Sequence, residues 1–279
     1  MRLNMIKHGK FKENEKSETE NQDHLYREIQ IEFLIHELKD PIAVIDAGAR
    51  LLLENRDKCG VLTARQEKAL QRILRSAKKA GSMLHDILEI GRSKAGCFSC
   101  CRFKPAEALY DVLIDSMETI VSVSPYEQQK KFEYNNELIK WLAEQGVFLD
   151  IAPEIMREEI EQDETKFRQI AGNLFKNALY YRAGHVEIKL NRKEDFLILN
   201  VADDGPGIEP EDHQNVFKRY VKVENHPGFS RKGHGIGLAG ALVMARCLGG
   251  NIEIESRRGK GANFRLIFPV SMKTKVMAS

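Results

Sequence analysis

His36 and Glu37 are adjacent residues whose types fit a nucleophile with a base beside it. They open the stretch HELKDPI, which lies in an amphipathic helical pattern that Pro41 interrupts. One nitrogen of an imidazole can attack an electrophile while the neighbouring carboxylate accepts the proton from the other nitrogen. Pro41 removes a backbone hydrogen bond, so we expect the helix to bend just after His36. A single exposed histidine is usually an ordinary surface residue, so this interpretation depends on the rest of the chain.

Asn173 and Asn177 are the first of several residues in the second half of the chain that suit a nucleotide pocket. They are four apart in an expected helix, so both side-chain amides lie on one face. The carbonyl oxygen of an asparagine is a hard, neutral ligand that suits Mg²⁺. We expect Asn177 to bind the metal, with Asn173 as a further candidate ligand.

Asp203, Gly205 and Gly207 follow an expected strand in the segment VADDGPGI. A carboxylate at the end of a strand can accept a hydrogen bond from an exocyclic amine such as that of adenine. The glycines allow a tight turn in which a ring approaches the backbone closely. By itself, this segment is more typical of a plain turn with helix-capping aspartates.

Gly233, Gly235 and Gly237 precede a helix that we expect to begin near residue 236. Free N–H groups and the positive end of the helix dipole make such a start a phosphate-binding site. The preceding segment VFKRYVKVENHPGFSRK is basic, and we interpret it as a lid in which Lys218 and Arg219 neutralise phosphate charge. Taken alone, each of these residues could equally belong to a solvated loop.

The order of these motifs carries more information than any one of them. It resembles the N, G1, F and G2 boxes in the ATP-binding domain of sensor histidine kinases, and HELKDPI resembles their H box. The resemblance covers roughly residues 28–95 and 160–270. It implies ATP and Mg²⁺ as cofactors, autophosphorylation of His36 with Glu37 as general base, and transfer of the phosphoryl group to an aspartate on a response-regulator receiver domain.

Two stretches of apolar residues at alternating spacings of three and four predict a pair of long helices. The segment ENRDKCG between them is typical of a turn, so we expect an antiparallel hairpin. Each seam of such a hairpin is buried on one side only, which favours a homodimer with a four-helix bundle; the alternative is packing on the chain's own second domain. The seams are Ile31, Leu34, Leu38, Ile42, Ile45, Ala49 and Leu52, then Leu70, Ile73, Ala77, Ala80, Leu84 and Ile87.

From about residue 103, short strand patterns alternate with helical ones, which predicts an α/β sandwich with a mixed sheet and helices on one face. The fold class is therefore α + α/β. The expected strands are 147–151, 185–190, 196–203, 251–256 and 262–268, and the expected helices include 163–182 and 236–248. The expected domains are a disordered polar arm (1–22), the hairpin (23–95), a linker (96–104), the ATP-binding domain (105–271) and a tail (272–279).

Composition excludes several classes of protein. The formal net charge of +2 gives no argument for nucleic acid as a partner. No apolar run approaches the roughly 18 residues of a membrane span, and the first residues lack the apolar core of a secretory signal. Five cysteines then indicate a reducing, cytoplasmic location. We expect the input signal to come from a bound partner such as an upstream sensor protein, or from the cysteines of the linker.

Cys97, Cys100 and Cys101 lie in the expected linker. We interpret them as buried small hydrophobic residues, and zinc binding or oxidation sensing remain as alternatives. Asp40 stands four residues after His36, where the family commonly has Thr or Asn, and it adds negative charge beside the phosphoryl group. We therefore expect weak phosphatase activity, which the decay of a phosphorylated partner would measure.

Two other functions fit parts of this pattern. One is a non-catalytic interaction protein that keeps the fold and binds nucleotide poorly. The other is an ATP-hydrolysing machine of the chaperone type, whose members typically place a glutamate where this chain has Asn173. That asparagine and the presence of HELKDPI favour the kinase.

Overall fold

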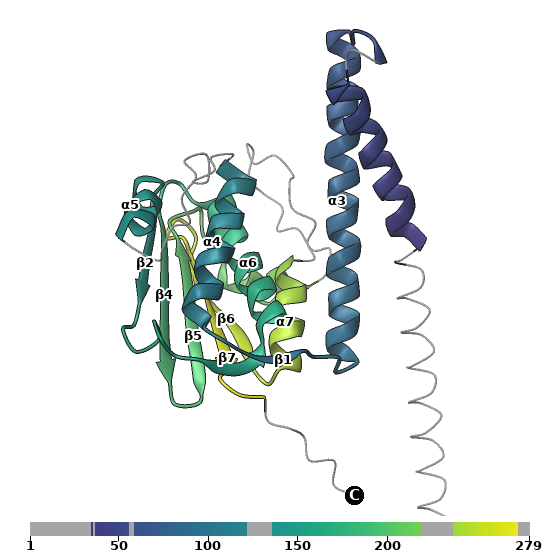
Figure 1. The fold of residues 1–279 in the computed structure, drawn as a ribbon. Coiled ribbons are helices and arrows are strands. Elements are labelled where there is room, and N and C mark those ends of the chain that lie inside the picture. Colours follow the sequence, from purple (N-terminus) through teal and green to yellow (C-terminus); the bar gives the residue numbers. More distant parts are fainter. Residues whose placement is uncertain (1–34, 36, 56–58, 122–135, 219–236, 273–279) are drawn as a thin grey trace, which may run out of the picture. The chain divides into compact units, whose positions relative to one another are not determined.

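The structure is a computed structural model that describes residues 35, 37–55, 59–121, 136–218 and 237–272. The chain divides into two compact units, residues 1–95 and 96–279 (Figure 1). The first unit is helical, and the second is an α/β layer structure, as the sequence predicted. In the described ranges, we find no helix that is both long and apolar enough to cross a bilayer.

The first unit is the predicted helical hairpin. Residues 37–54 are helical, and α3 spans Ala64–Lys94. Thr63 starts α3 with a reciprocal cap: its hydroxyl accepts from the N–H of Gln66, and the Gln66 side chain accepts from the N–H of Thr63. The two helices meet closely, because a Cβ placed on Gly81 would lie 4.0 Å from Cγ2 of Ile42.

The apolar residues of the first helix fall into two rows with different burial. Ile35 and Ala49 are only 6% and 4% exposed, whereas Leu38 and Ile45 are 50% and 49% exposed. The predicted seam left out Ile35 and placed Ala49 together with Leu38 and Ile45, but only the row of Ile35 and Ala49 is buried. Large apolar side chains on α3 also remain exposed, among them Ile73. A single hairpin therefore leaves a second apolar row uncovered.

The second unit is built on a mixed sheet. Its strands β2 and β4 are parallel, and the remaining neighbours are antiparallel. The order across the sheet is β2 (Val147–Ile151), β4 (Val186–Lys193), β5 (Phe196–Asp203), β7 (Ala262–Pro269) and β6 (Asn251–Ser256). All five strands were predicted from short strand-like runs in the sequence.

Helices α4 (Pro105–Val121), α6 (Glu164–Tyr181) and α7 (Gly237–Cys247) cover one face of this sheet (Figure 1). The core between the two layers includes the fully buried rings of Phe167 and Phe264. The other face carries a cross-strand row of five polar residues, four of them charged. That row runs Asp150, Lys189, Asn200, Arg265 and Glu253.

Three elements were not predicted. Strand β1 (Cys100–Phe103) pairs antiparallel with β3 (Ile160–Asp163), and α5 (Asn136–Glu144) precedes β2. Neither short strand alternates cleanly between apolar and polar residues, and α5 lies in a polar stretch. The expected linker 96–104 therefore contains a strand of the second unit. We accordingly propose that the ATP-binding domain starts at residue 96 and not at 105.

The burial predicted for the cysteines is wrong. Cys97, Cys100 and Cys101 are all exposed, while Phe98 and Phe103 supply the apolar contacts of this segment. Large rings fill the core more effectively than thiols do, so the cysteines are left on the outside. Among the described residues, we find no cluster of three side chains that could bind a metal ion through His, Cys, Asp or Glu.

Candidate nucleotide-binding site

Helix α6 carries the two asparagines. Its first turn is capped by Asp163, whose Oδ1 accepts from the N–H of Lys166 at 2.9 Å. Asn173 and Asn177 follow one turn apart at half-buried positions, as predicted. A Cβ placed on Gly237 would lie 3.2 Å from Oδ1 of Asn173, so the start of α7 touches this asparagine. The fold thus brings the N-x-x-x-N helix and the last glycine of GHGIGL together.

Asp203 ends β5 with a buried carboxyl group that is 8% exposed. Its Oδ1 accepts a hydrogen bond from the N–H of Gly205 at 2.9 Å. Burial raises the pKa of Asp203 to about 6, although hydrogen bonds from the N–H groups of Gly205 and Ala262 oppose this rise. At neutral pH the group is therefore an ionised acceptor that is poorly solvated by water. A ligand amine would supply a hydrogen bond that water does not.

Asp204 has a structural role that the sequence analysis missed. Its Oδ1 accepts from the N–H groups of Ala183 at 2.8 Å and His185 at 3.0 Å, and Gly184 also donates to the carboxylate. Burial alone would raise the pKa of Asp204, but these hydrogen bonds together lower it below its ordinary value. Asp204 thereby fixes the chain that follows α6 beside the glycine turn. The doubled aspartate in VADDGPGI was the available signal.

The glycines of VADDGPGI are required by close backbone contacts. A Cβ on Gly205 would overlap the carbonyl oxygen of Tyr181, and one on Gly207 (φ +69) would overlap that of Arg257. Gly261 (φ +74) approaches the carbonyl of Asp203 in the same way. The turn is therefore wedged between the end of α6 and the β6–β7 connection, and only glycine fits at these positions.

Gly207→Ala and Gly259→Ala form a matched pair of substitutions. Both glycines have positive φ (+69 and +75), but a Cβ on Gly259 meets open space. We expect Gly259→Ala to cost about 1 kcal/mol of unfolding free energy from backbone strain alone. Gly207→Ala should cost about 3 kcal/mol, because overlap with the Arg257 carbonyl adds to the strain. Urea denaturation followed by circular dichroism would measure both, and equal losses would contradict this account of the turn.

A hollow of about 620 Å³ borders Asp203 at the ends of β5, β6 and β7. His213 and Asn263 line it, and each has a buried side-chain atom, Nε2 and Oδ1 respectively, without a hydrogen-bond partner in the described part of the chain. Glu255, Arg257 and Lys260 add charges of both signs to the lining. This region therefore suits a polar ligand better than an apolar one.

The remaining predicted site residues are only partly described. Lys218 is exposed just after the short helix η3 (Asn215–Phe217), and its Nζ donates to Oδ1 of Asn215 at 2.8 Å. Glu37 is exposed on the first helix of the hairpin unit. His36, Arg219, Gly233 and Gly235 lie outside the residues that the structure describes.

Comparison with known families agrees with this geometry. Residues 162–272 match the family described as "Histidine kinase-, DNA gyrase B-, and HSP90-like ATPase". Residues 27–96 match "His Kinase A (phospho-acceptor) domain". The second unit is thus an ATPase domain of this group. With a phospho-acceptor domain before it, the chain belongs to the sensor histidine kinases of two-component systems.

Individual relatives align with most of this chain. The aerobic respiration control sensor protein ArcB of Escherichia coli K12 is 30% identical over 239 residues, which are 85% of this chain and 28% of ArcB. The adaptive-response sensory kinase SasA of Synechococcus sp. JA-3-3Ab is 27% identical over 249 residues, 88% of this chain and 60% of SasA. The chain therefore spans less than two thirds of these relatives.

A solved structure confirms the fold class. Full-length ShkA in complex with AMPPNP aligns with a TM-score of 0.61 and 23% identity, over 87% of this chain and 46% of ShkA. At this level of identity the likeness concerns the fold. A helical region followed by an α/β domain with a mixed sheet is common to both.

Proposed function

We propose that this protein is an ATP-dependent histidine autokinase that phosphorylates His36 and passes the phosphoryl group to an aspartate of a response-regulator receiver domain. The observation that carries the proposal is that α6 contacts both Gly237, through Asn173, and the turn after Asp203, through Tyr181, in a chain whose other unit contains HELKDPI. The AMPPNP in the ShkA structure supports nucleotide binding by this fold.

The nucleotide would bind with its adenine amine donating to Asp203, which is the buried acceptor at the end of β5. Gly205 and Gly207 would allow the ring to approach the turn, since side chains are excluded there. The start of α7 at Gly237, with Gly233 and Gly235 before it, would bind phosphate oxygens through backbone N–H groups. Lys218 and Arg219 would neutralise part of the triphosphate charge.

Asn177 would hold Mg²⁺, with Asn173 as a second ligand. The residues fit this ion, because both amides are half-buried on one face of α6 and Gly237 leaves space beside Oδ1 of Asn173. When bound, the ion would neutralise charge on the phosphate oxygens.

The hairpin would supply the acceptor. Glu37 accepts the proton from one nitrogen of His36, and the other nitrogen forms a bond to the γ-phosphorus as the bond to ADP breaks. An aspartate carboxylate of the receiver then attacks the phosphorus and releases His36. This sequence needs no base in the nucleotide pocket, in agreement with an asparagine at position 173.

Incubation with γ-labelled ATP and Mg²⁺ tests the proposal. We expect label on the protein that is labile in acid and stable in base, as a phosphorus–nitrogen bond is. Rapid hydrolysis of ATP without labelling of the protein would favour the ATP-hydrolysing machine. Absence of both labelling and hydrolysis would favour the non-catalytic interaction protein.

A homodimer would cover the exposed row of the hairpin, which includes Leu38 and Ile45. Ile45→Lys removes an apolar contact and buries a charge in each subunit, so we expect the dissociation constant to rise about 100-fold or more. Val44→Lys is the control, because Val44 is on the same helix, is 71% exposed and lies outside the predicted seam. Sedimentation equilibrium would measure both variants. Equal dissociation constants for them would contradict the assigned dimer surface.

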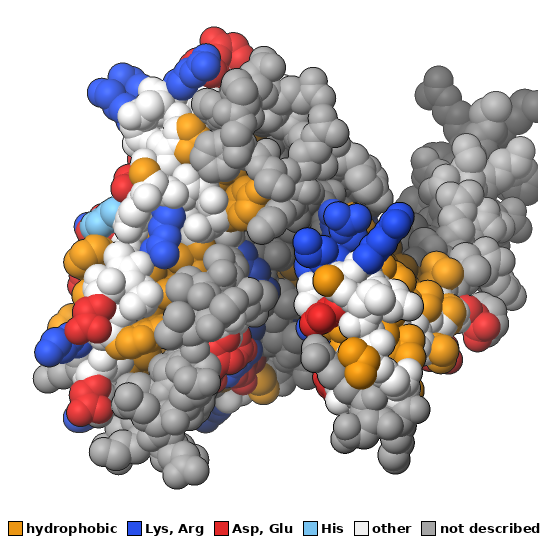
Figure 2. Space-filling view, turned by 90° about the horizontal axis from the view of Figure 1, so that it is seen from above, with side chains coloured by type: hydrophobic (Ala, Val, Ile, Leu, Met, Phe, Trp, Pro, Cys, Tyr) orange, Lys and Arg blue, Asp and Glu red, His pale blue; other side chains and the backbone are white. Residues whose placement is uncertain are grey.

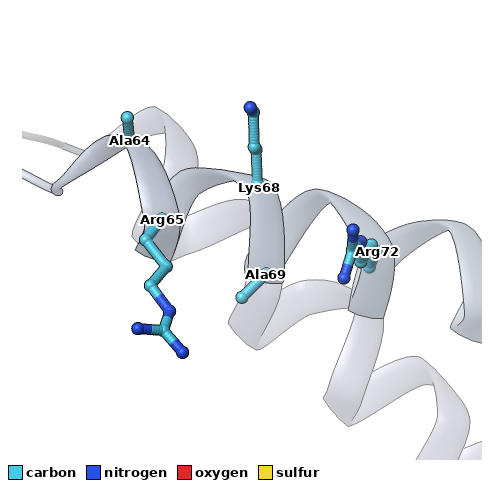
Figure 3. Close-up of a pocket in the computed structure, with 5 residues that line it drawn as sticks. All are labelled: Ala64, Arg65, Lys68, Ala69 and Arg72. Atoms are coloured by element: carbon cyan, nitrogen blue, oxygen red, sulfur yellow. The ribbon is translucent and has the colours of Figure 1, made fainter.

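The start of α3 offers a surface for an acidic partner. Arg65, Lys68 and Arg72 surround a shallow hollow with Ala64 and Ala69, and their side chains project away from the helix (Figure 3). Figure 2 shows basic side chains beside exposed hydrophobic ones at this end of the hairpin. Because the final acceptor is a carboxylate, we propose that the receiver domain docks on the hairpin with its acidic side towards these cations.

We also propose a cytoplasmic location and regulation by an upstream sensor protein. All five cysteines are free, as in a reducing compartment. Asp40 is exposed on the first helix, where it can place its charge beside an incoming phosphoryl group, and this supports the expected weak phosphatase activity.

A further inference from the structure

Cys97 and Cys100 form a C-x-x-C pair of exposed thiols at the start of the second unit. Residues 97–99 contain neither a turn nor a bend, and Cys100 is the first residue of β1. The segment follows directly on α3 and its C-cap Ala95, so it joins the two units covalently. Neither thiol has a part in the proposed phosphoryl transfer.

Ser99, between the two thiols, is bonded to the start of the ATP-binding helix. Its N–H donates to Oδ2 of Asp163 at 2.8 Å, and Oδ1 of the same carboxylate accepts from the N–H of Lys166 at 2.9 Å. Asp163 is only 2% exposed and is the N-cap of α6, which carries Asn173 and Asn177. One buried carboxylate therefore connects the C-x-x-C segment to the helix of the proposed site.

We propose that Cys97 and Cys100 are a reversible dithiol–disulfide pair whose closure withdraws Ser99 from Asp163 and loosens the start of α6. The absence of a turn over residues 97–99 supports this withdrawal, because a C-x-x-C pair closes most readily across a turn. In an extended segment, Cα atoms three residues apart are separated by about 10 Å. A disulfide needs about 4.4–6.8 Å between them, so residues 97–100 must fold into a turn for the bond to form.

The neighbouring Cys101 is less suited to this role. Its Sγ lies 3.7 Å from the carbonyl oxygen of Gln162 on β3, in a position fixed by strand pairing. Cys100 and Cys101 are consecutive in β1, so their side chains point to opposite faces. A bond between them would require distortion of β1, whereas one from Cys97 to Cys100 mainly rearranges the segment before it.

The reaction uses a low-molecular-weight disulfide as oxidant. The thiolate of Cys97 attacks one of its sulfurs, forms a mixed disulfide and releases one thiol. Cys100 then loses its proton and attacks Sγ of Cys97, which releases the second thiol. Two protein thiols and one external disulfide give one protein disulfide and two external thiols. Desolvation, then the negative charge of Glu161, raises the pKa of Cys100, which favours Cys97 as the first to react.

Oxidation of the full chain with glutathione disulfide tests the proposal, with blocking of remaining thiols and peptide mapping by mass spectrometry. We expect one Cys97–Cys100 disulfide that dithiothreitol reverses. Amide hydrogen exchange at Lys166 should become about threefold faster or more in the oxidised form, because its cap loses an anchor. Cys97→Ser and Cys100→Ser should lose both effects, and the exposed Cys101→Ser, as the matched control, should keep both.

Several outcomes would overturn the proposal. These are a disulfide that includes Cys101, a cross-link between two copies of the chain, a mixed disulfide that never closes, and closure that leaves exchange at Lys166 unchanged. Hydrogen exchange does not depend on phosphoryl transfer. Failure of this test is therefore distinct from failure of the proposed kinase function.

Discussion

His36→Gln is expected to reduce labelling of the protein by γ-labelled ATP by at least about 1,000-fold, to background. The glutamine amide is polar and of similar reach, but its nitrogen is not a nucleophile because its lone pair is delocalised. Nucleotide affinity should stay unchanged, since the nucleotide site belongs to the other unit. Filter-binding of labelled protein and titration with a fluorescent ATP analogue would measure the two quantities.

Asn177→Ala is the complementary variant. It should abolish labelling because the proposed Mg²⁺ ligand is lost, while the acceptor His36 is unchanged. Mixed dimers of the two variants then distinguish two routes of transfer. Labelling restored by mixing shows transfer between subunits, and its absence shows transfer within one subunit. Labelling of His36→Gln at the level of the unchanged protein would exclude His36 as the acceptor.

Asp203→Asn is expected to stabilise the protein while weakening nucleotide binding. Burial raises the pKa of Asp203 from 3.8 to about 6, so the folded protein binds this proton more tightly than the unfolded chain does. The free energy of unfolding should therefore fall as pH rises through this interval and level off above it. At pH 8 the variant avoids the cost of a buried charge, and we expect a gain of about 1–2 kcal/mol.

The same substitution should weaken ATP binding about 10- to 100-fold at pH 8, because a charge-assisted hydrogen bond to adenine is lost. The N–H of Gly205 donates to Oδ1, so the side-chain oxygen of the asparagine would take that position. The asparagine NH2 group would then face the adenine amine, and two donors cannot form a hydrogen bond with each other. In the unchanged protein, affinity should fall below a pH of about 6 as the carboxylate takes up its proton.

Asp204→Asn is the matched control, since it is the same change at the next residue. The pKa of Asp204 is lowered by backbone N–H donors, so its ionised form stabilises the fold and its loss should destabilise the protein. Urea denaturation at pH 5 and pH 8, with nucleotide titration, would compare the two variants. Stability changes of the same sign would contradict the different roles assigned to the two carboxylates.

The sequence was sufficient for the parts of the fold in which local pattern and burial agree. The strand-like runs 196–203 and 262–268 predicted β5 and β7, since β7 alternates between buried and half-buried residues and β5 contains a mostly buried apolar run. The sequence failed for β1 and β3, since CCRF and IEQD are held by each other and carry little pattern of their own. Spacing predicted the hairpin, but the predicted seam left out the buried Ile35 and included the exposed Leu38.

In the candidate nucleotide site too, the sequence predicted residues that belong to local motifs and missed residues whose role depends on distant contacts. Asn173, Asp203 and Gly207 were predicted because each belongs to a recognisable short motif. Asp204 and Gly261 were missed as site residues, because their importance depends on which backbone groups lie opposite them in space. A Cβ on Gly261 would overlap the carbonyl of Asp203, and a contact between residues so distant in sequence leaves no local pattern.

Helices cover one face of the sheet of the second unit, and this asymmetry implies a difference in mutational tolerance. On the outer face, Lys189 lies between Asp150 and Asn200, and Arg265 lies beside Glu253. Exchanges of the exposed Lys189 that keep a polar side chain should be nearly neutral, because water solvates either residue, whereas Nε of Arg265 is buried. The inner face packs Phe167 against Phe268, where a change of a single methylene alters the fit. Substitutions that accumulate in descendants of this chain should therefore fall mainly on every second residue of a strand, where the side chain lies on the outer face.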